Sequence, residues 1–264
     1  MEQFHPTDAE AGAMGKESKR VLLNTPPRNR THTAANLLAE MERFNYKRTV
    51  LLPIELPVSR HHSERTLEAA RMDERLIPFT GLYPKPWNQA KETLAGKRIA
   101  AGARGVKFHP EFQFMGADAP AAMKMFDWCA ENDVLVLAHT GFTGREPAFM
   151  RAFAEPERFV PALKTFKKLR IVLAHTGSRK RLNETLALAR QFEDRVWLEF
   201  SGQPVPAIRL ILEKFDTEKI VYGSDWPYYP LEVSLARFLV ATEGYEHLRE
   251  KILHDNAVRL FGSV

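Results

Sequence analysis

The chain has 264 residues, which is long enough for one large α/β domain or for two small domains. Hydrophobic residues make up 44% and charged residues 27%, a balance that excludes a disordered chain and allows a sizeable core. The formal net charge is +5, but lysine and arginine are scattered and form no stripe interleaved with aromatic residues. This pattern argues against a nucleic-acid partner and favours attraction of a small anionic molecule.

The single cysteine, Cys129, lies in a segment with helical spacing, where we expect it to pack in the core. One cysteine cannot form a disulfide within the chain, which is typical of a protein in the reducing cytoplasm. No apolar run approaches the roughly 20 residues of a membrane span. The N-terminal segment lacks the apolar core of a signal peptide. We therefore expect a cytoplasmic protein without a membrane partner.

Apolar runs typical of buried strands alternate with helical periodicity from about residue 36 to the C-terminus. The elements are expected in this order: helix 34–45, strand 49–55, helix 64–73, strand 76–84, helix 88–95, strand 105–110, helix 119–132, strand 134–141, a longer connection with helix 158–168, strand 171–177, helix 181–192, strand 196–202, helix 207–215, strand 220–227, and helices 231–243 and 250–262. Thr33 or Asn36 is a candidate N-cap of the first helix, and Gly262 is a candidate C-cap of the last.

The regular alternation of seven strands and helices predicts one parallel α/β domain over residues 1–264. An eighth unit would close a (β/α)8 TIM barrel, and the unit that is missing or degenerate is the first. Residues 1–35 are predicted to be irregular, and Lys19–Asn24 is the best strand candidate among them.

Two strands end in nearly the same sequence, VLVLAHTG at Val134–Gly141 and IVLAHTG at Ile171–Gly177. A third, IVYGSDWP at Ile220–Pro227, carries Asp225 where the first two carry His139 and His175. Each of these three residues continues an odd-spaced apolar series, so each is expected on the strand face of that series. If those faces point into the barrel, the three side chains converge at its C-terminal mouth, where parallel barrels place their sites. Histidine and carboxylate ligands with an open position predict a catalytic Zn, Mn or Fe site, with capping of strand ends as the alternative.

The segment GVKFHP adds Lys107 and His109 on one strand face. His109 is a candidate to polarise a carbonyl or to bind metal, and Lys107 to neutralise a substrate carboxylate; a snorkelling lysine and a turn histidine are the alternatives. Glu199 points either into the barrel mouth or outward. Trp226 and Tyr228, which follow the last strand, are candidate pocket walls and substrate contacts. His61 and His62 lie in a polar stretch and are expected to be solvated, whereas His32, His247 and His254 are expected at surface or packing positions.

The set GVKFHP, VLAHTG, VLAHTG, YGSDWP and the closing HDNAVRLFG resembles the metal-dependent amidohydrolase superfamily. The resemblance covers roughly residues 34–264 and is closest to the amidohydrolase-related (amidohydrolase 2) TIM-barrel branch, which also contains decarboxylases of aromatic acids. It implies metal ligands at His139, His175 and Asp225, with Asp225 also moving protons. It further implies a metal-activated water that attacks a carbonyl polarised by the metal and a histidine such as His109.

One departure from that family is large. Its first strand carries a His-x-His ligand pair, and no His-x-His occurs in these 264 residues; His5 is the only histidine near the start. We hypothesise that Met1 is an internal methionine of a longer protein whose first strand lies upstream. A stop codon upstream of Met1, before any strand with His-x-His, would refute this.

The leading hypothesis is a hydrolase that uses a divalent metal, with zinc as the first choice, on an amide, ester or lactone of a small, anionic substrate. A nonoxidative decarboxylase acting on an aromatic or related carboxylic acid at the same site is the close alternative. A catalytically impaired barrel kept for binding is the third hypothesis, since the His-x-His pair is absent. A homodimer is the default expectation for the assembly.

Overall fold

The structure is a computed structural model and describes residues 33–58 and 61–262 of the chain. The predictions for His5, for His32, for the candidate strand Lys19–Asn24 and for residues 1–32 in general lie outside the described residues. In the part of the chain that is described, no helix combines the length and the apolar character needed to cross a membrane.

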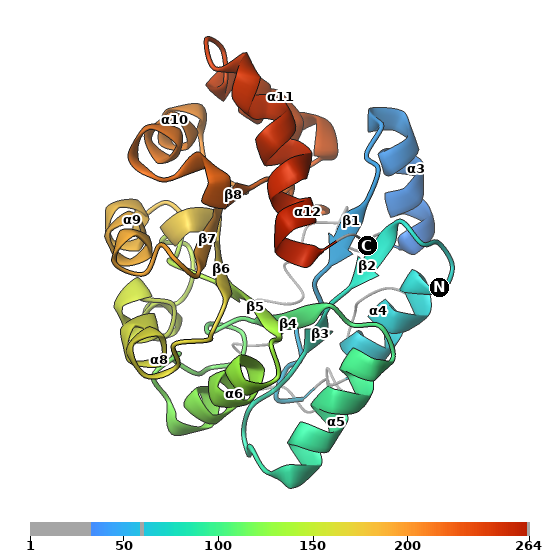
Figure 1. The fold of residues 1–264 in the computed structure, drawn as a ribbon, viewed down its shortest axis with the longest axis vertical. Helices are drawn as coiled ribbons and strands as arrows, with labels where there is room; N and C mark the ends of the chain where they lie inside the picture. The colour runs from blue at the N-terminus through green and yellow to red at the C-terminus, as the bar shows by residue number, and fades with distance from the viewer. Residues whose placement is uncertain (1–32, 59–60, 263–264) are drawn as a thin grey trace.

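Short parallel strands alternate with helices along the described chain (Figure 1). The strands are β1 (Thr49–Leu51), β2 (Leu76–Pro78), β3 (Thr80–Gly81), β4 (Gly105–Phe108), β5 (Leu135–His139), β6 (Ile171–Ala174), β7 (Val196–Glu199) and β8 (Ile220–Val221). The α-helices are α3 (Ala34–Phe44), α4 (His62–Ala70), α5 (Gln89–Ala100), α6 (Pro120–Glu131), α7 (Ala148–Arg151), α8 (Val160–Thr165), α9 (Leu182–Gln191), α10 (Val205–Lys214), α11 (Leu231–Ala241) and α12 (Asn256–Phe261). Short 3-10 or π segments precede or follow several of them, at η2 (Pro156–Phe159), η3 (His175–Gly177), η4 (Thr217–Lys219), η5 (Glu246–Leu248) and η6 (Lys251–Asp255).

The strands follow one another around a barrel in sequence order. Strands β3 to β8 form one parallel six-stranded sheet, and β1 pairs in parallel with β2. Only Phe79 separates β2 from β3, and its N–H donates to Leu51 O at 2.9 Å, so the two ladders share one continuous stretch of chain. Most of the helices lie around the outside of this ring of strands (Figure 1). The chain therefore has the TIM-barrel fold, with seven strand positions in the described residues.

Alternate strand residues face two separate apolar cores. Val136, Ala138, Ile171 and Leu173 belong to the large core between the strands and the surrounding helices. Their neighbours in sequence face the barrel interior, in a smaller core made of Phe79, Leu135, Leu137, Val172, Ala174, Val221 and Leu260. This alternation is the period of two expected for strands with one face toward the barrel axis.

Strands β1 and β8 are the two edges of the described barrel. Among the described residues, β1 pairs with β2 alone and β8 pairs with β7 alone. Side chains connect the two edges: Tyr46, before β1, and Tyr222, after β8, share a hydrogen bond of 2.7 Å between their hydroxyl oxygens. The helix α12 lies between β8 and β1 (Figure 1), and Phe261 packs edge-on against Phe79 with ring centroids 5.9 Å apart.

The predicted elements are confirmed, with differences mainly at their ends. Thr33 is the N-cap of α3 and accepts a hydrogen bond from Asn36 N, and Gly262 follows α12 with a φ of 77°. The predicted strand 49–55 ends at Leu51, because the chain then turns toward α4. The expectation that His62 is solvated is wrong: it is buried, and its Nδ1 lies 2.6 Å from Ile54 O. Cys129 is buried on α6, as predicted.

Candidate active site

The C-terminal ends of the strands surround a cavity of about 1520 Å³. Every candidate named from the sequence reaches its wall, namely Lys107, His109, His139, His175, Glu199, Asp225, Trp226 and Tyr228. Parallel barrels build their active sites at this end, so the location of the cavity agrees with a catalytic role.

The end of β4 delivers two buried side chains to the cavity. Lys107 and His109 share the inner face, as predicted, while Val106 and Phe108 pack in the outer core. A tight turn follows, and Gln113 fixes it: its amide accepts from His109 N at 3.0 Å and donates to Glu55 O and Leu82 O. His109 is thereby held at the cavity wall by the backbone around it.

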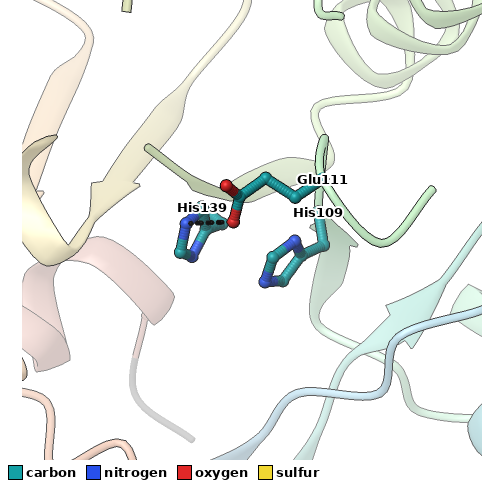
Figure 2. A group of neighbouring side chains, drawn as sticks. All are labelled: His109, Glu111 and His139. Carbon is teal, nitrogen blue, oxygen red and sulfur yellow. Dashed lines mark ion pairs between the residues drawn. The ribbon is translucent and has the colours of Figure 1, made fainter. Parts of the chain in front are cut away.

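His139, at the end of β5, lies in the centre of the histidine cluster. Its ring is stacked on His109 with centroids 4.1 Å apart, and the centroid of His175 is 4.7 Å away. Glu111 points toward the same place from the turn after β4 (Figure 2), and its Oε2 lies 3.3 Å from His139 Nε2. Glu111 is not among the residues predicted from the sequence, although the spacing His109-x-Glu111 directly after a strand is a signal that points to it.

His175 reaches the cavity by a route that differs from the predicted one. The series Ile171, Leu173, His175 was expected to share an inward face, but Ile171 and Leu173 pack in the outer core. The strand ends at Ala174, and His175 adopts a φ of 62°, in the left-handed region, which redirects its side chain. A non-glycine residue in that region is strained, and such strain is common at functional sites.

The threonines of the two AHTG motifs make the same type of hydrogen bond, each from its hydroxyl to a backbone carbonyl of the next strand. Thr140 Oγ1 donates to Ala174 O at the end of β6 (2.8 Å), and Thr176 Oγ1 donates to Glu199 O at the end of β7 (2.9 Å). Each threonine therefore ties its own strand end to the next strand. The repeated sequence has a structural cause in addition to the histidine that it carries.

Glu199 faces inward, where it organises His175. Its Oε2 accepts from His175 N at 3.2 Å and from Ser201 Oγ at 2.9 Å, and Ser201 Oγ lies 2.8 Å from His175 Nδ1. Gly223 makes room for this carboxylate, since a Cβ there would lie 2.4 Å from Glu199 Oε1. The His175 ring is thus oriented through one of its two nitrogens.

Asp225 lies beyond β8 in the left-handed region, with a φ of 56°. Burial away from water raises the pKa of its carboxyl, and the negative charge of Glu199 raises it further. The positive charge of Lys107 opposes both effects. Burial lowers the pKa of Lys107, and Asp225 and Glu199 oppose that change. Lys107 therefore interacts electrostatically with both Asp225 and Glu199, and its positive charge partly offsets the repulsion between the two carboxylates.

The two flanking histidines are held neutral. Burial lowers the pKa of His109 and of His175 well below the ordinary value of 6.5, and His139 and Lys107 lower both further. Neutral imidazole is the form that binds metal. In the described residues, one group of three or more histidine, cysteine or acidic side chains could hold a metal ion, and it consists of His109, Glu111 and His139. It contains one of the three predicted ligands, so the role of His175 and Asp225 as ligands stays a prediction.

Comparison with known proteins identifies relatives of this barrel. A family model described as Amidohydrolase matches residues 5–263. No curated protein matches the chain significantly.

Solved structures share the fold at low sequence identity. 2,6-Dihydroxybenzoate decarboxylase from Rhizobium is 16% identical, with a TM-score of 0.72 over 98% of this chain and 96% of that one. 5-Carboxyvanillate decarboxylase from Sphingomonas paucimobilis is 14% identical, with a TM-score of 0.71 over 96% and 93%. A probable 2-pyrone-4,6-dicarboxylic acid hydrolase from Acinetobacter baumannii is 18% identical, with a TM-score of 0.67 over 87% and 89%.

Proposed function

The chain belongs to the amidohydrolase family, whose members are metal-dependent enzymes, and on that premise we propose that it hydrolyses an amide, ester or lactone of a small anionic substrate. One observation carries the proposal. Three histidines (His109, His139, His175), three carboxylates (Glu111, Glu199, Asp225) and Lys107, all from the segments that run from β4 to the turn after β8, line one cavity at the catalytic end of the barrel. Bound there, a divalent metal supplies Lewis-acid activation of a carbonyl and of water.

Three side chains of the cavity wall are placed to bind the substrate, to polarise its carbonyl and to transfer a proton. Lys107 is buried and positively charged beside the histidines, so it is placed to bind a substrate carboxylate. His109 is placed to donate a hydrogen bond to a carbonyl oxygen as negative charge develops on it. Asp225, whose carboxyl pKa is raised toward neutrality, is placed to take and return a proton. Trp226 and Tyr228 also line the cavity and are placed to contact the substrate.

Further details of the proposal concern the metal and the protein as a whole. Zinc suits a set of imidazole and carboxylate ligands, and manganese and iron are the alternatives. We also propose a single domain, a homodimer as the default assembly and a cytoplasmic location, the last supported by the single buried cysteine.

Decarboxylation is the second candidate, because two of the similar structures are decarboxylases of aromatic acids. In that reaction Lys107 would hold the carboxylate that leaves, and Asp225 would deliver the proton that replaces it. The same cavity serves both reactions, so the substrate decides between them.

The test uses the purified full chain, loaded with Zn²⁺, and two substrates taken from the similar structures. Ring opening of 2-pyrone-4,6-dicarboxylate is followed by ultraviolet absorbance, and CO₂ release from 2,6-dihydroxybenzoate by a coupled assay. The His139→Ala variant removes the central histidine, and His247→Ala, on an exposed histidine away from the cavity, is the control.

Ring opening that requires His139 but not His247 supports the hydrolase. CO₂ release with the same dependence supports the decarboxylase. A folded, metal-loaded protein that performs neither reaction, also on a wider set of anionic esters and lactones, would favour a barrel kept for binding.

A further inference from the structure

The loops that follow β5 and β6 carry a second group of positive charges at the mouth of the cavity. Arg145 and Arg179 line the cavity wall, and both residues are exposed. We propose that these two arginines bind a second carboxylate of the substrate, away from the carboxylate that Lys107 binds. The inference rests on the proposed function, because it extends the anionic substrate of that function to an elongated molecule with a carboxylate at each end.

The two loops lie against each other. A Cβ added to Gly144 would lie 3.3 Å from Lys180 Cε, so the Lys180 side chain passes over the loop that carries Arg145. Lys180 itself follows Arg179 directly in the sequence. Three cationic residues are thus gathered on two adjoining loops, and their positive potentials add at the rim of one cavity, where they attract an anion.

The loop after β5 is held by hydrogen bonds that occupy its own carboxylate. Glu146 accepts from Thr143 N at 3.0 Å, from Thr143 Oγ1 at 2.7 Å and from Gly144 N at 2.8 Å. Arg151 closes the loop from the other side, because it donates to Glu146 O at 2.9 Å and to Gly144 O at 2.8 Å. The Glu146 carboxylate therefore stabilises the loop and does not neutralise Arg145.

The residues on both sides of Arg179 are fixed as well. Ser178 Oγ donates to Thr140 O at 3.0 Å, which ties the start of the loop to the end of β5. At its other end, Arg181 Nη2 donates to Glu155 Oε1 at 3.0 Å. The Glu155 carboxylate is thus paired with Arg181, and Arg179 is presented from a loop that is anchored on both sides.

Arg145 and Arg179 have no anionic partner of their own. Within residues 33–58 and 61–262, no ion pair and no side-chain hydrogen bond involves either guanidinium group. Neighbouring cations repel each other, and an anion bound between them removes that repulsion. The planar guanidinium group matches a carboxylate, which it binds through two parallel hydrogen bonds. The two arginines therefore form a carboxylate site at the rim, whereas Lys107 is buried on β4.

Aromatic side chains near the arginines suit a ligand with an apolar body. Phe114 and Phe149 line the same cavity, and their rings are stacked with centroids 6.3 Å apart and an interplanar angle of 13°. Phe149 is 53% exposed and Phe114 is 37% exposed, so both present apolar surface that a ligand would cover. The cavity of about 1520 Å³ is also larger than the roughly 300–1,000 Å³ typical of small-molecule sites. It therefore has room for a molecule longer than a single ring.

The experiment measures binding of four acids to the full chain, loaded with Zn²⁺, by isothermal titration calorimetry. Terephthalate is paired with benzoate, and biphenyl-4,4′-dicarboxylate with biphenyl-4-carboxylate, so each pair differs only in the second carboxylate. In wild type the second carboxylate is expected to tighten binding by about tenfold or more in at least one pair, the effect of one hydrogen bond between charged groups. This gain should shrink as the salt concentration rises from about 0.1 M to about 1 M.

Two variants and a control locate the gain. The double variant Arg145→Gln/Arg179→Gln should lose it and keep the wild-type affinity for the two monoacids. Arg104→Gln is the matched control, because Arg104 is exposed and directly precedes β4, at the opposite end of the barrel. It should keep the gain, and near-ultraviolet circular dichroism checks that each variant is folded.

The outcomes separate this inference from the proposed function. A wild type that binds the monoacids but gains nothing from a second carboxylate overturns the inference. So does a double variant that keeps the gain, or one that loses affinity equally for monoacids and diacids. The carboxylate site of the proposed function is tested separately by Lys107→Met, which should lose affinity for benzoate. A folded wild-type protein that binds none of the four acids overturns both.

Discussion

The two AHTG motifs contact each other through their glycines, and this contact yields a sharp stability prediction. Gly141 has a φ of 70° and Gly177 a φ of 78°, both in the region that favours glycine. A Cβ on Gly141 would lie 1.9 Å from Gly177 O, which is backbone and cannot rotate away. The ends of β5 and β6 can therefore approach closely only with glycine at this position.

We expect Gly141→Ala to lower the free energy of unfolding by about 2–5 kcal/mol. About 1–2 kcal/mol comes from a left-handed conformation with a Cβ, and about 1–3 kcal/mol from forcing atoms into a filled space. Gly244→Ala is the matched control, because Gly244 has a φ of 84° and a Cβ there would meet nothing within 4 Å. It should cost only the conformational part, about 1–2 kcal/mol.

Urea unfolding of the metal-free proteins, followed by tryptophan fluorescence, gives both values. The difference between the two variants isolates the steric part. Equal losses in Gly141→Ala and Gly244→Ala would refute the argument that contact between the motifs sets the approach of the two strand ends.

Three other predictions concern buried or partly buried groups outside the histidine cluster. Tyr46→Phe removes the hydrogen bond to Tyr222 and should cost about 1 kcal/mol of unfolding free energy in urea, whereas an unchanged value would mean that the contact contributes nothing. Burial raises the pKa of the Glu55 carboxyl above its ordinary 4.5, so its charging destabilises the fold as pH rises from there. The stability of Glu55→Gln relative to wild type should therefore improve as the pH rises above the ordinary carboxyl value of 4.5, and a constant difference would contradict this. Burial also raises the pKa of the Cys129 thiol, so Ellman's reagent should modify it only after unfolding; rapid modification of the native protein would contradict its burial.

The sequence was sufficient to predict the barrel and the region of its site. Buried parallel strands leave near-continuous apolar runs, and the residue after each run lies at the catalytic end. That rule predicted the positions of His139 and Asp225 at the cavity, and the period of two correctly placed Lys107 and His109 on one inward face.

The predictions that failed or were missing depend on local backbone conformation. With the period of two, His175 would point outward with Leu173, which packs in the outer core. Its ring enters the cavity because the backbone of His175 itself adopts a left-handed conformation at the strand end. Glu111 lies on a turn, where no period relates a residue to the strand before it. Its position depends on hydrogen bonds of Gln113 to segments more than 30 residues away in sequence, which no local pattern encodes.

The open side of the described barrel does not compromise the site, because the residues that form the site share one ladder. Strands β4 to β8 belong to the uninterrupted sheet β3–β8, in which each strand is hydrogen-bonded to the next. Contacts across the open side, between Tyr46 and Tyr222 and between Phe79 and Phe261, act on the edges of that ladder. The strands that lead to His109, His139 and Asp225 are therefore held relative to one another by backbone pairing within β3–β8. Closure between β1 and β8 governs mainly the stability of the edges and the access of solvent from the side.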